Sequence, residues 1–216
     1  MAEEARDLTM NDKPLQIVGR TGSLFTRLPL IFAEELGVAY DLVVIKDLAA
    51  MEPDIYAGNP ALRMPILREN DSVLFGAQNI CRAVAERAAT PARIVWPEDL
   101  SDILSRNAQE LVWHCMAAQV QILMGTHVGK LPADNVFFAK ARAGLEGALG
   151  WLDQHAADVL TALPQQRSLS LFEVALYCLI DHVQFGSTVP VANHASLLSF
   201  AREFGARPSA RRTAYR

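Results

Sequence analysis

Two hydroxyl side chains, Ser23 and Thr21, lie in a short loop where a predicted strand is followed by a predicted helix. A hydroxyl and the unpaired amides of a helix start hydrogen-bond a thiolate more strongly than a thiol. Such a loop therefore lowers the pKa of a nearby thiol from its usual value of about 8.5. Either hydroxyl could act in this way. Both could instead be ordinary loop residues.

A second candidate feature is Pro65, at the junction of a loop and a predicted strand. A residue before proline is pushed into an extended conformation, and a cis proline at such a junction turns the preceding backbone groups outward. Met64 would then offer its N–H and C=O like an edge strand, and an extended peptide could pair with them. For Pro65 alone, a rigid turn is the other interpretation.

The elements that position these residues follow from the spacing of apolar side chains. Short β-branched runs at 15–19 and 40–45 predict two strands, and helical spacing between them predicts a helix that ends at Gly37. Pro29 is compatible with that helix if it lies in the first turn. The strand-helix-strand order predicts parallel pairing through a right-handed crossover.

Two further runs, 65–68 and 72–75, flank a polar turn cluster and predict an antiparallel hairpin. A helix over about 77–88 follows. This half of the chain therefore predicts a small mixed sheet with helices, in the order βαβ and then ββα.

The remainder of the chain has helical periodicity in place of strand signals. Residues 90–97 contain two prolines and are predicted to be a linker. A Ser170 to Glu173 spacing is typical of a capping box at a helix start. The sequence thus predicts a tail at 1–14, an α/β domain at 15–89, the linker at 90–97 and an all-helical domain at 98–216. Helices are expected over about 98–126, 133–163, 171–185 and 194–204.

The composition excludes several classes of protein. Apolar residues form 51% and charged residues 20% of the 216 residues, which suits a folded protein rather than a disordered one. The net charge is −4 and no basic face is evident, so a nucleic-acid partner is not expected. No apolar run approaches the ~20 residues of a membrane span, and residues 1–13 lack the apolar stretch of a secretory signal. We expect no membrane partner and a cytoplasmic location.

The cysteines and histidines do not indicate metal or disulfide chemistry. The three cysteines are far apart, form no Cys-x-x-Cys pair and lie among apolar residues, so buried free thiols are expected. The five histidines show no metal-ligand spacing with one another or with the cysteines, and no metal site is expected. These residues are Cys81, Cys115, Cys178, His114, His127, His155, His182 and His194.

Several segments together resemble the glutathione transferase superfamily. The stretch Asn-Pro-Ala-Leu-Arg-Met-Pro-Ile-Leu at 59–67 resembles the family's Asn-Pro-x-Gly-x-Val-Pro-x-Leu, and it lies between the second strand and the hairpin, as in the family. Leu74-Phe75 with 80–82, the capping box at 170–173 and Arg-Pro-Ser at 207–209 add to the match. The resemblance runs from about residue 15 to residue 213. It implies a thioredoxin-like first domain followed by a helical bundle.

The resemblance also implies a chemistry. Ser23 and Arg27 resemble the Ser-x-x-x-Arg loop of the serine-using classes, in which the nucleophile is the sulfur of glutathione, the co-substrate. The resemblance therefore implies that Ser23 activates this thiol, with Thr21 as the alternative. The cysteinyl part of glutathione would pair with Met64. Trp113 and Met116 lie on a helix that the family turns partly toward its active cleft, although core packing is the other interpretation. A twofold homodimer is also implied. The residues implied to bind glutathione are Arg63, Met64, Pro65, Ala77 and Gln78.

The chain departs from the family at Gly76 and Ala77, where the family usually has Glu and Ser to hold the γ-glutamyl group. The helix-start amides of Ala77 and Gln78 could still receive a carboxylate. The two lost side chains are expected to cost about 1 to 3 kcal/mol each in binding. Replacing Gly76 by Glu and Ala77 by Ser is therefore expected to strengthen glutathione binding roughly tenfold or more.

The leading hypothesis for function is a glutathione S-transferase that adds the activated thiol to an electrophilic, largely apolar small molecule. The alternative is a divergent, non-catalytic protein of the same fold that binds another ligand or a protein partner, which Gly76 and Ala77 favour. Isomerase, dehalogenase or peroxidase chemistry with the same thiol also stays open.

Overall fold

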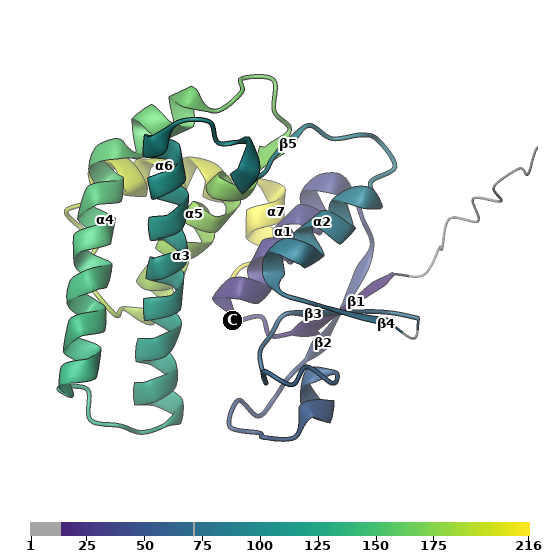
Figure 1. The fold of residues 1–216 in the computed structure, drawn as a ribbon, viewed down its shortest axis with the longest axis horizontal. Helices are drawn as coiled ribbons and strands as arrows, with labels where there is room; N and C mark the ends of the chain where they lie inside the picture. Colours follow the sequence, from purple (N-terminus) through teal and green to yellow (C-terminus); the bar gives the residue numbers. More distant parts are fainter. Residues whose placement is uncertain (1–13, 71) are drawn as a thin grey trace, which may run out of the picture.

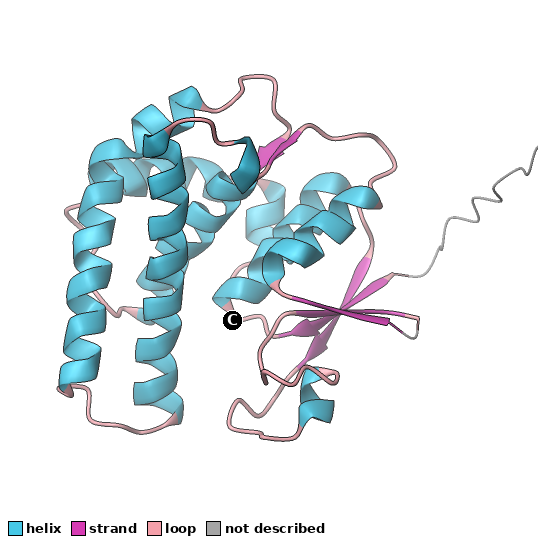
Figure 2. Cartoon of the chain, in the orientation of Figure 1, coloured by secondary structure: helices cyan, strands magenta, loops and turns pink. Residues whose placement is uncertain are grey.

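The computed structural model describes residues 14–70 and 72–216, and its arrangement is shown in Figures 1 and 2. The predicted N-terminal tail lies outside the described residues except for Pro14. A sheet with two helices forms the first domain, and a group of longer helices stands beside it. This is the predicted architecture, a thioredoxin-like α/β unit followed by a helical one.

The first domain is built on a four-stranded mixed sheet in the order β2-β1-β3-β4. The first two strands are parallel, whereas β3 is antiparallel to both β1 and β4, as the predicted crossover and hairpin require. Two helices connect and close this sheet. The elements are β1 (Leu15–Gly19), α1 (Leu24–Leu36), β2 (Tyr40–Val44), β3 (Ile66–Glu69), β4 (Ser72–Phe75) and α2 (Ala77–Glu86).

Alternating side chains on the central strands serve two separate cores. Ile17 and Leu67 pack in the main core with α1 and α2, which lie together above the sheet in Figure 1. Val18 and Ile66 point to the opposite face and pack with Tyr56, which belongs to a 3-10 turn, Pro53–Tyr56. Both faces of the sheet are therefore covered, as the period of two along a strand demands.

Helix α1 differs from the expectation at one point. It begins at Leu24 because Ser23 caps it, so Pro29 is the sixth residue of the helix and not part of the first turn. Proline has no N–H to donate to the carbonyl four residues earlier, here that of Phe25. The helix nevertheless continues to Leu36 and ends at Gly37 with φ 66°, as predicted.

The helical domain contains two long helices side by side, α3 and α4, and a central buried helix, α5 (Figure 1). All but a few α5 side chains are buried, and α5 also contacts α1 of the first domain. None of the described helices is long and apolar enough to cross a membrane. The elements are α3 (Ile103–Leu123), a π-helical turn (Met124–Val128), α4 (Val136–Ala162), α5 (Leu171–Gly186), α6 (Ala195–Gly205) and α7 (Pro208–Arg212).

The sequence did not predict three short elements, two strands and helix α7. Residues 90–97, expected to be a plain linker, contribute β5 (Ile94–Val95), which pairs in parallel with β6 (Leu169–Ser170). Helix α7 is also short, and its start at Pro208 is a favoured first helical position. Two strand residues or one helical turn carry too little periodicity to be recognised.

The cap of α5 is confirmed at Ser170, whose Oγ accepts a hydrogen bond from the Glu173 amide at 3.0 Å. The Glu173 carboxylate has different partners from those of a capping box. It accepts from the Ser170 hydroxyl at 2.8 Å and from two nitrogens of Arg167 at 2.6 and 2.8 Å. Burial alone would raise the pKa of Glu173, but these hydrogen bonds outweigh it and hold that pKa below its usual range.

We expect Arg167→Met to lower the free energy of unfolding by about 3 kcal/mol at neutral pH, because it leaves the largely buried Glu173 carboxylate without its cation. The folded-state pKa of Glu173 is depressed. The stabilisation is therefore fully present above the unfolded-state pKa of about 4.3 and is lost as pH falls through the folded-state value. Denaturant unfolding at neutral pH and near pH 3 measures this. The exposed pair Arg82–Glu98 provides the control, and Arg82→Met should cost about 1 kcal/mol or less. An Arg167→Met effect that is equally large at both pH values would contradict the assignment.

Candidate functional site

A cavity of about 1100 Å³ lies between the loops of the first domain and helices α3 and α5. The first domain contributes the loops that follow β1 and precede β3 and α2. The helical domain contributes a mostly apolar wall. The residues most relevant here are Ser23, Phe25, Arg63, Met64, Pro65, Gly76, Ala77, Ala117, Val120, Leu123, Met124, Phe137, His182 and Phe185.

Ser23 lines this cavity at the start of α1. Its Oγ accepts a hydrogen bond from the Thr26 amide at 3.2 Å, which leaves the hydroxyl hydrogen to be donated into the cavity. Thr21 is placed differently, since its hydroxyl donates to the backbone oxygen of Arg216 at 3.3 Å and the residue is not among those lining the cavity. The geometry therefore favours Ser23 over Thr21 as a donor to a ligand.

The Met64–Pro65 peptide bond is cis, as predicted, and both residues line the same cavity as Ser23. The preceding loop is held by Asn59, which is almost fully buried. Its side-chain amide donates to the Arg63 carbonyl at 2.8 Å and accepts from the Ala61 amide at 3.0 Å. The first residue of the Asn-Pro motif thus shapes the loop that presents Met64, a role that the sequence analysis did not assign.

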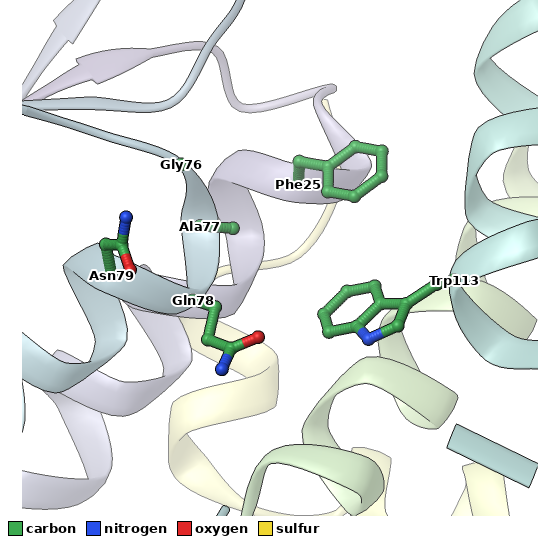
Figure 3. A pocket seen from close by; sticks show the side chains of 6 residues that line it. All are labelled: Phe25, Gly76, Ala77, Gln78, Asn79 and Trp113. Atoms are coloured by element: carbon green, nitrogen blue, oxygen red, sulfur yellow. The ribbon is translucent and has the colours of Figure 1, made fainter. Parts of the chain in front are cut away.

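Gly76, Ala77 and Gln78 border a second, adjoining cavity of about 410 Å³ (Figure 3). The other lining residues are Asn79, Phe25 and Trp113, and the last two rings are stacked with their centroids 6.4 Å apart. The Gln78 side chain extends from the start of α2 toward Trp113. None of the six lining residues carries a charge, so this cavity offers backbone amides, one amide side chain and aromatic surface.

The backbone at Gly76 alters one expectation from the sequence. Gly76 is the N-cap residue of α2 and has φ 91°, a conformation that residues with a Cβ rarely adopt. A built Cβ would meet only the Asn79 amide nitrogen, at 3.9 Å, so the obstacle is backbone strain and not lack of space. The combined Glu and Ser replacement is therefore less favourable than the sequence suggested.

Trp113 and Met116 lie on different faces of α3. Trp113 lines the smaller cavity, and Ala117, Val120 and Met124 continue the same helical stripe along the larger one. Met116 is fully buried in the core and lines neither cavity, so its assignment to the acceptor pocket is wrong. It lies on the opposite stripe, with the buried residues at 112, 115 and 119.

The charged side chains that line the larger cavity have one sign. Its lining includes three arginines and neither Asp nor Glu. A cavity lined by one sign of charge attracts ligands of the opposite sign. The three residues are Arg20, Arg63 and Arg216.

The cysteines are not suited to act as nucleophiles. All three are buried and free, and burial raises the pKa of Cys115 and of Cys178 to about 12 and that of Cys81 well above its usual value. A reactive cysteine needs an exposed, stabilised thiolate. Thiol chemistry at this site would therefore use the sulfur of a ligand.

Comparison with known proteins relates the first domain to glutathione S-transferases. The sequence profile described as "Glutathione S-transferase, N-terminal domain" matches residues 22–87, which contain Ser23, the Asn-Pro motif and the start of α2. Residues 22–87 therefore resemble the N-terminal domain of glutathione S-transferases. This match does not distinguish the serine-using classes from the others.

Solved glutathione transferases share the fold over nearly the whole chain. One from Methylobacterium radiotolerans, in complex with glutathione sulfonate, is 18% identical with a TM-score of 0.73, covering 94% of this chain and 96% of that one. One from Methylobacillus flagellatus with glutathione bound is 19% identical with a TM-score of 0.72, covering 94% and 100%. A family member from Pseudomonas fluorescens with bound glutathione is 16% identical with a TM-score of 0.69, covering 94% and 99%. Comparison with curated protein sequences found no match.

In this glutathione transferase fold, the arginine of the Ser-x-x-x-Arg loop joins the two domains. Arg27 is 1% exposed and donates to Asp181 at 2.5 Å, to the Tyr177 hydroxyl at 3.0 Å and to the Ala210 carbonyl at 3.0 Å. Its guanidinium also lies 4.1 Å from the centroid of the Tyr215 ring. The motif residue is thus a structural link between α1, α5 and the C-terminal segment, and it does not line the cavity.

Two arginines of the C-terminal segment pair with α1, Arg207 with Glu35 at 3.3 Å and Arg212 with Glu34 at 2.9 Å. These pairs link the C-terminal segment to the helix that begins at Ser23.

Proposed function

We propose that the chain binds glutathione in the larger cavity and conjugates its thiol to an electrophilic small molecule. The observation that carries this proposal is the position of Ser23. Its hydroxyl caps α1 and can donate into a cavity that Met64 also lines. That lining includes three arginine side chains and neither Asp nor Glu. The glutathione-bound neighbours support the choice of ligand, because they have the same fold.

Glutathione fits the chemistry of this cavity. Its extended backbone could pair with the N–H and C=O of Met64, and its two carboxylates suit the arginines of the lining. The Ser23 hydroxyl would donate to the sulfur and stabilise the thiolate, while the thiol proton leaves to solvent. The sulfur then forms a bond to an electrophilic carbon of the acceptor. In a displacement the bond to the leaving group breaks and that group departs as an anion, and in an addition the π bond of an activated alkene breaks and its other carbon takes a proton from solvent.

The acceptor would lie against the helical wall of the cavity. This wall is largely apolar, with Val120, Leu123 and Met124 from α3 and its π-helical turn, and Phe137 and Phe185 from α4 and α5. An apolar electrophile would gain from burial there, at about 25 cal/mol for each Å² removed from water. A screen of glutathione conjugation with apolar electrophiles tests the proposal. Turnover that requires both glutathione and Ser23 would support it, and no turnover with any electrophile would reject it.

We expect Ala77→Ser to strengthen glutathione binding by up to about tenfold. The new hydroxyl would add one donor at the start of α2, worth about 1 kcal/mol, beside the helix amides that remain. Gly76→Glu should bring little gain, because φ 91° costs a residue with a Cβ about 1 to 2 kcal/mol. Calorimetric titration of the two single variants and the double variant measures this. A larger gain from Gly76→Glu than from Ala77→Ser would show that our description of this turn is wrong.

The second candidate is a non-catalytic protein of this fold that binds another ligand or a protein partner. The uncharged lining of the smaller cavity favours it, since a zwitterionic γ-glutamyl group would find no charged side chain there. Comparing glutathione with its N-acetylated form separates the candidates. Binding of neither compound favours the alternative, whereas binding of glutathione favours the transferase.

We further propose that the protein works in the cytoplasm as a twofold homodimer, as the resemblance to glutathione transferases suggests. Light scattering at micromolar concentration should give about twice the chain mass of 23.7 kDa. A monomer under those conditions would count against the dimer.

A further inference from the structure

A buried chain of hydrogen bonds leads from the helical domain to the residue before Ser23. The Thr188 hydroxyl donates to Oε1 of Gln119, and Nε2 of that side chain lies 3.1 Å from Nδ1 of His182. The other ring nitrogen, Nε2 of His182, lies 3.2 Å from the backbone oxygen of Gly22. Gln119 is 0% exposed and His182 is 4% exposed, so water does not compete for these groups.

Two backbone carbonyls fix the direction of these bonds, because a carbonyl only accepts. Nε2 of His182 must therefore carry the hydrogen that it donates to Gly22. The Gln119 atom that lies 3.2 Å from the His182 carbonyl must likewise be the amide nitrogen, which donates to that carbonyl. The neutral ring has a lone pair on Nδ1, which accepts from the same amide nitrogen. Oε1 of Gln119 then accepts from the Thr188 hydroxyl.

His182 is neutral in this arrangement. Burial lowers the pKa of His182 below its ordinary value, against the opposing effect of its hydrogen bond to the Gly22 carbonyl. A proton added at Nδ1 would face the Gln119 NH₂ group, which is itself a donor. Although His182 lines the cavity, both of its ring nitrogens are engaged by protein groups, so it is not placed to act as a base toward a ligand.

The hydrogen bond from His182 to Gly22 restrains the loop that carries Ser23. Gly22 directly precedes Ser23, and Thr21 on its other side donates to the backbone oxygen of Arg216. Space here is limited, since a Cβ on Gly22 would lie 3.2 Å from that same oxygen. His182 of α5 thus holds the loop that carries the Ser23 hydroxyl, and Gln119 of α3 orients the His182 ring.

We propose that His182 is a positioning residue for the thiol site, holding the Gly22 carbonyl so that the Ser23 hydroxyl is directed at the ligand's sulfur. This inference rests on the proposed function for its catalytic consequence. Its structural part, the anchoring of the Ser23 loop from the helical domain, can be measured without any ligand. A displacement of about 1 Å at a reacting group is enough to slow a reaction by a large factor.

Two substitutions separate positioning from simple packing. His182→Leu removes both hydrogen bonds, whereas His182→Gln keeps an N–H donor at about the reach of Nε2. His114→Leu serves as the matched control, because His114 lies on the surface of α3 with its side chain 67% exposed. Each variant is compared with the unaltered chain in amide hydrogen exchange of residues 20–24, in kcat and KM for glutathione, and in thermal stability.

We expect His182→Leu to raise exchange in residues 20–24 and to lower kcat about tenfold or more, with KM for glutathione changed less than about threefold. His182→Gln should restore most of both properties, and His114→Leu should match the unaltered chain. Unchanged loop exchange in His182→Leu would overturn the inference. The inference would also be overturned if His182→Leu and His182→Gln lost kcat equally and lost thermal stability equally. The N–H donor restored in His182→Gln would then have no effect on the rate. If the unaltered chain conjugates no electrophile, the proposed function fails, and the exchange data alone then decide whether His182 anchors the loop.

Discussion

Replacing Ser23 by alanine should lower the rate of glutathione conjugation by about tenfold to a hundredfold, with little change in affinity for glutathione. A hydrogen bond to a charged group is worth about 1.5 to 3 kcal/mol, and its loss raises the pKa of the bound thiol by about one to two units. The reactive thiolate fraction at neutral pH falls in proportion. Steady-state kinetics with saturating glutathione measures the effect.

Two controls accompany this experiment. Thr21→Val should have a much smaller effect on the rate, because the Thr21 hydroxyl already donates to the Arg216 backbone oxygen. Ser23→Ala also removes the cap of α1 and should cost about 1 kcal/mol of stability, so unfolding is measured in parallel. A larger loss of rate in Thr21→Val than in Ser23→Ala would show that Thr21, and not Ser23, contacts the thiol.

Replacing Arg27 by methionine should lower the free energy of unfolding by about 2 to 4 kcal/mol, mainly because buried acceptors lose their donor at about 1 to 3 kcal/mol each. The Asp181 side chain is 37% exposed, so water can still hydrate its charge. The change leaves Asp181 without its cation and removes the donors to the Tyr177 hydroxyl and the Ala210 carbonyl. Denaturant unfolding measures it. These hydrogen bonds join α1 to α5 and to the C-terminal segment. The substitution should therefore destabilise the packing of the C-terminal segment as well as that of α1.

The exposed pair Arg212–Glu34 provides the comparison for this prediction. It also joins the C-terminal segment to α1, but the Arg212 side chain is 67% exposed, so Arg212→Met should cost about 1 kcal/mol or less. Equal and small losses in the two variants would mean that the Arg27 cluster contributes no more than a surface ion pair.

Much of the fold could be predicted from local patterns. The strands of the first domain, the hairpin, α1 ending at Gly37 and the cap at Ser170 each leave a signal within about ten residues. The Ser23 loop and the Asn-Pro motif could be located for the same reason, because both lie at the junction of two predictable elements. Pro29 was misplaced by one turn since helix starts are set by the capping side chain and not by the proline.

The parts that escaped prediction depend on which distant segments meet. The contact from His182 to Gly22 spans 160 residues, and the ion pair from Arg27 to Asp181 spans 154. Helical spacing shows that α3 has two stripes but not which one faces the cavity, and Met116 was therefore assigned wrongly. The φ of Gly76 also escaped prediction, and its amide donates to the carbonyl of Pro65, eleven residues earlier, at 3.4 Å.

The central claim, that this chain binds glutathione and stabilises its thiolate beside Ser23, is tested most directly by the pKa of the bound thiol. The measurement is an ultraviolet titration of thiolate absorbance against pH, with saturating glutathione, on the unaltered chain and on Ser23→Ala. We predict a bound thiol pKa at least about one unit below the usual 8.5 in the unaltered chain and a return toward that value in the variant. A bound thiol that titrates like free glutathione in the unaltered chain, or no binding at millimolar glutathione, would contradict the account.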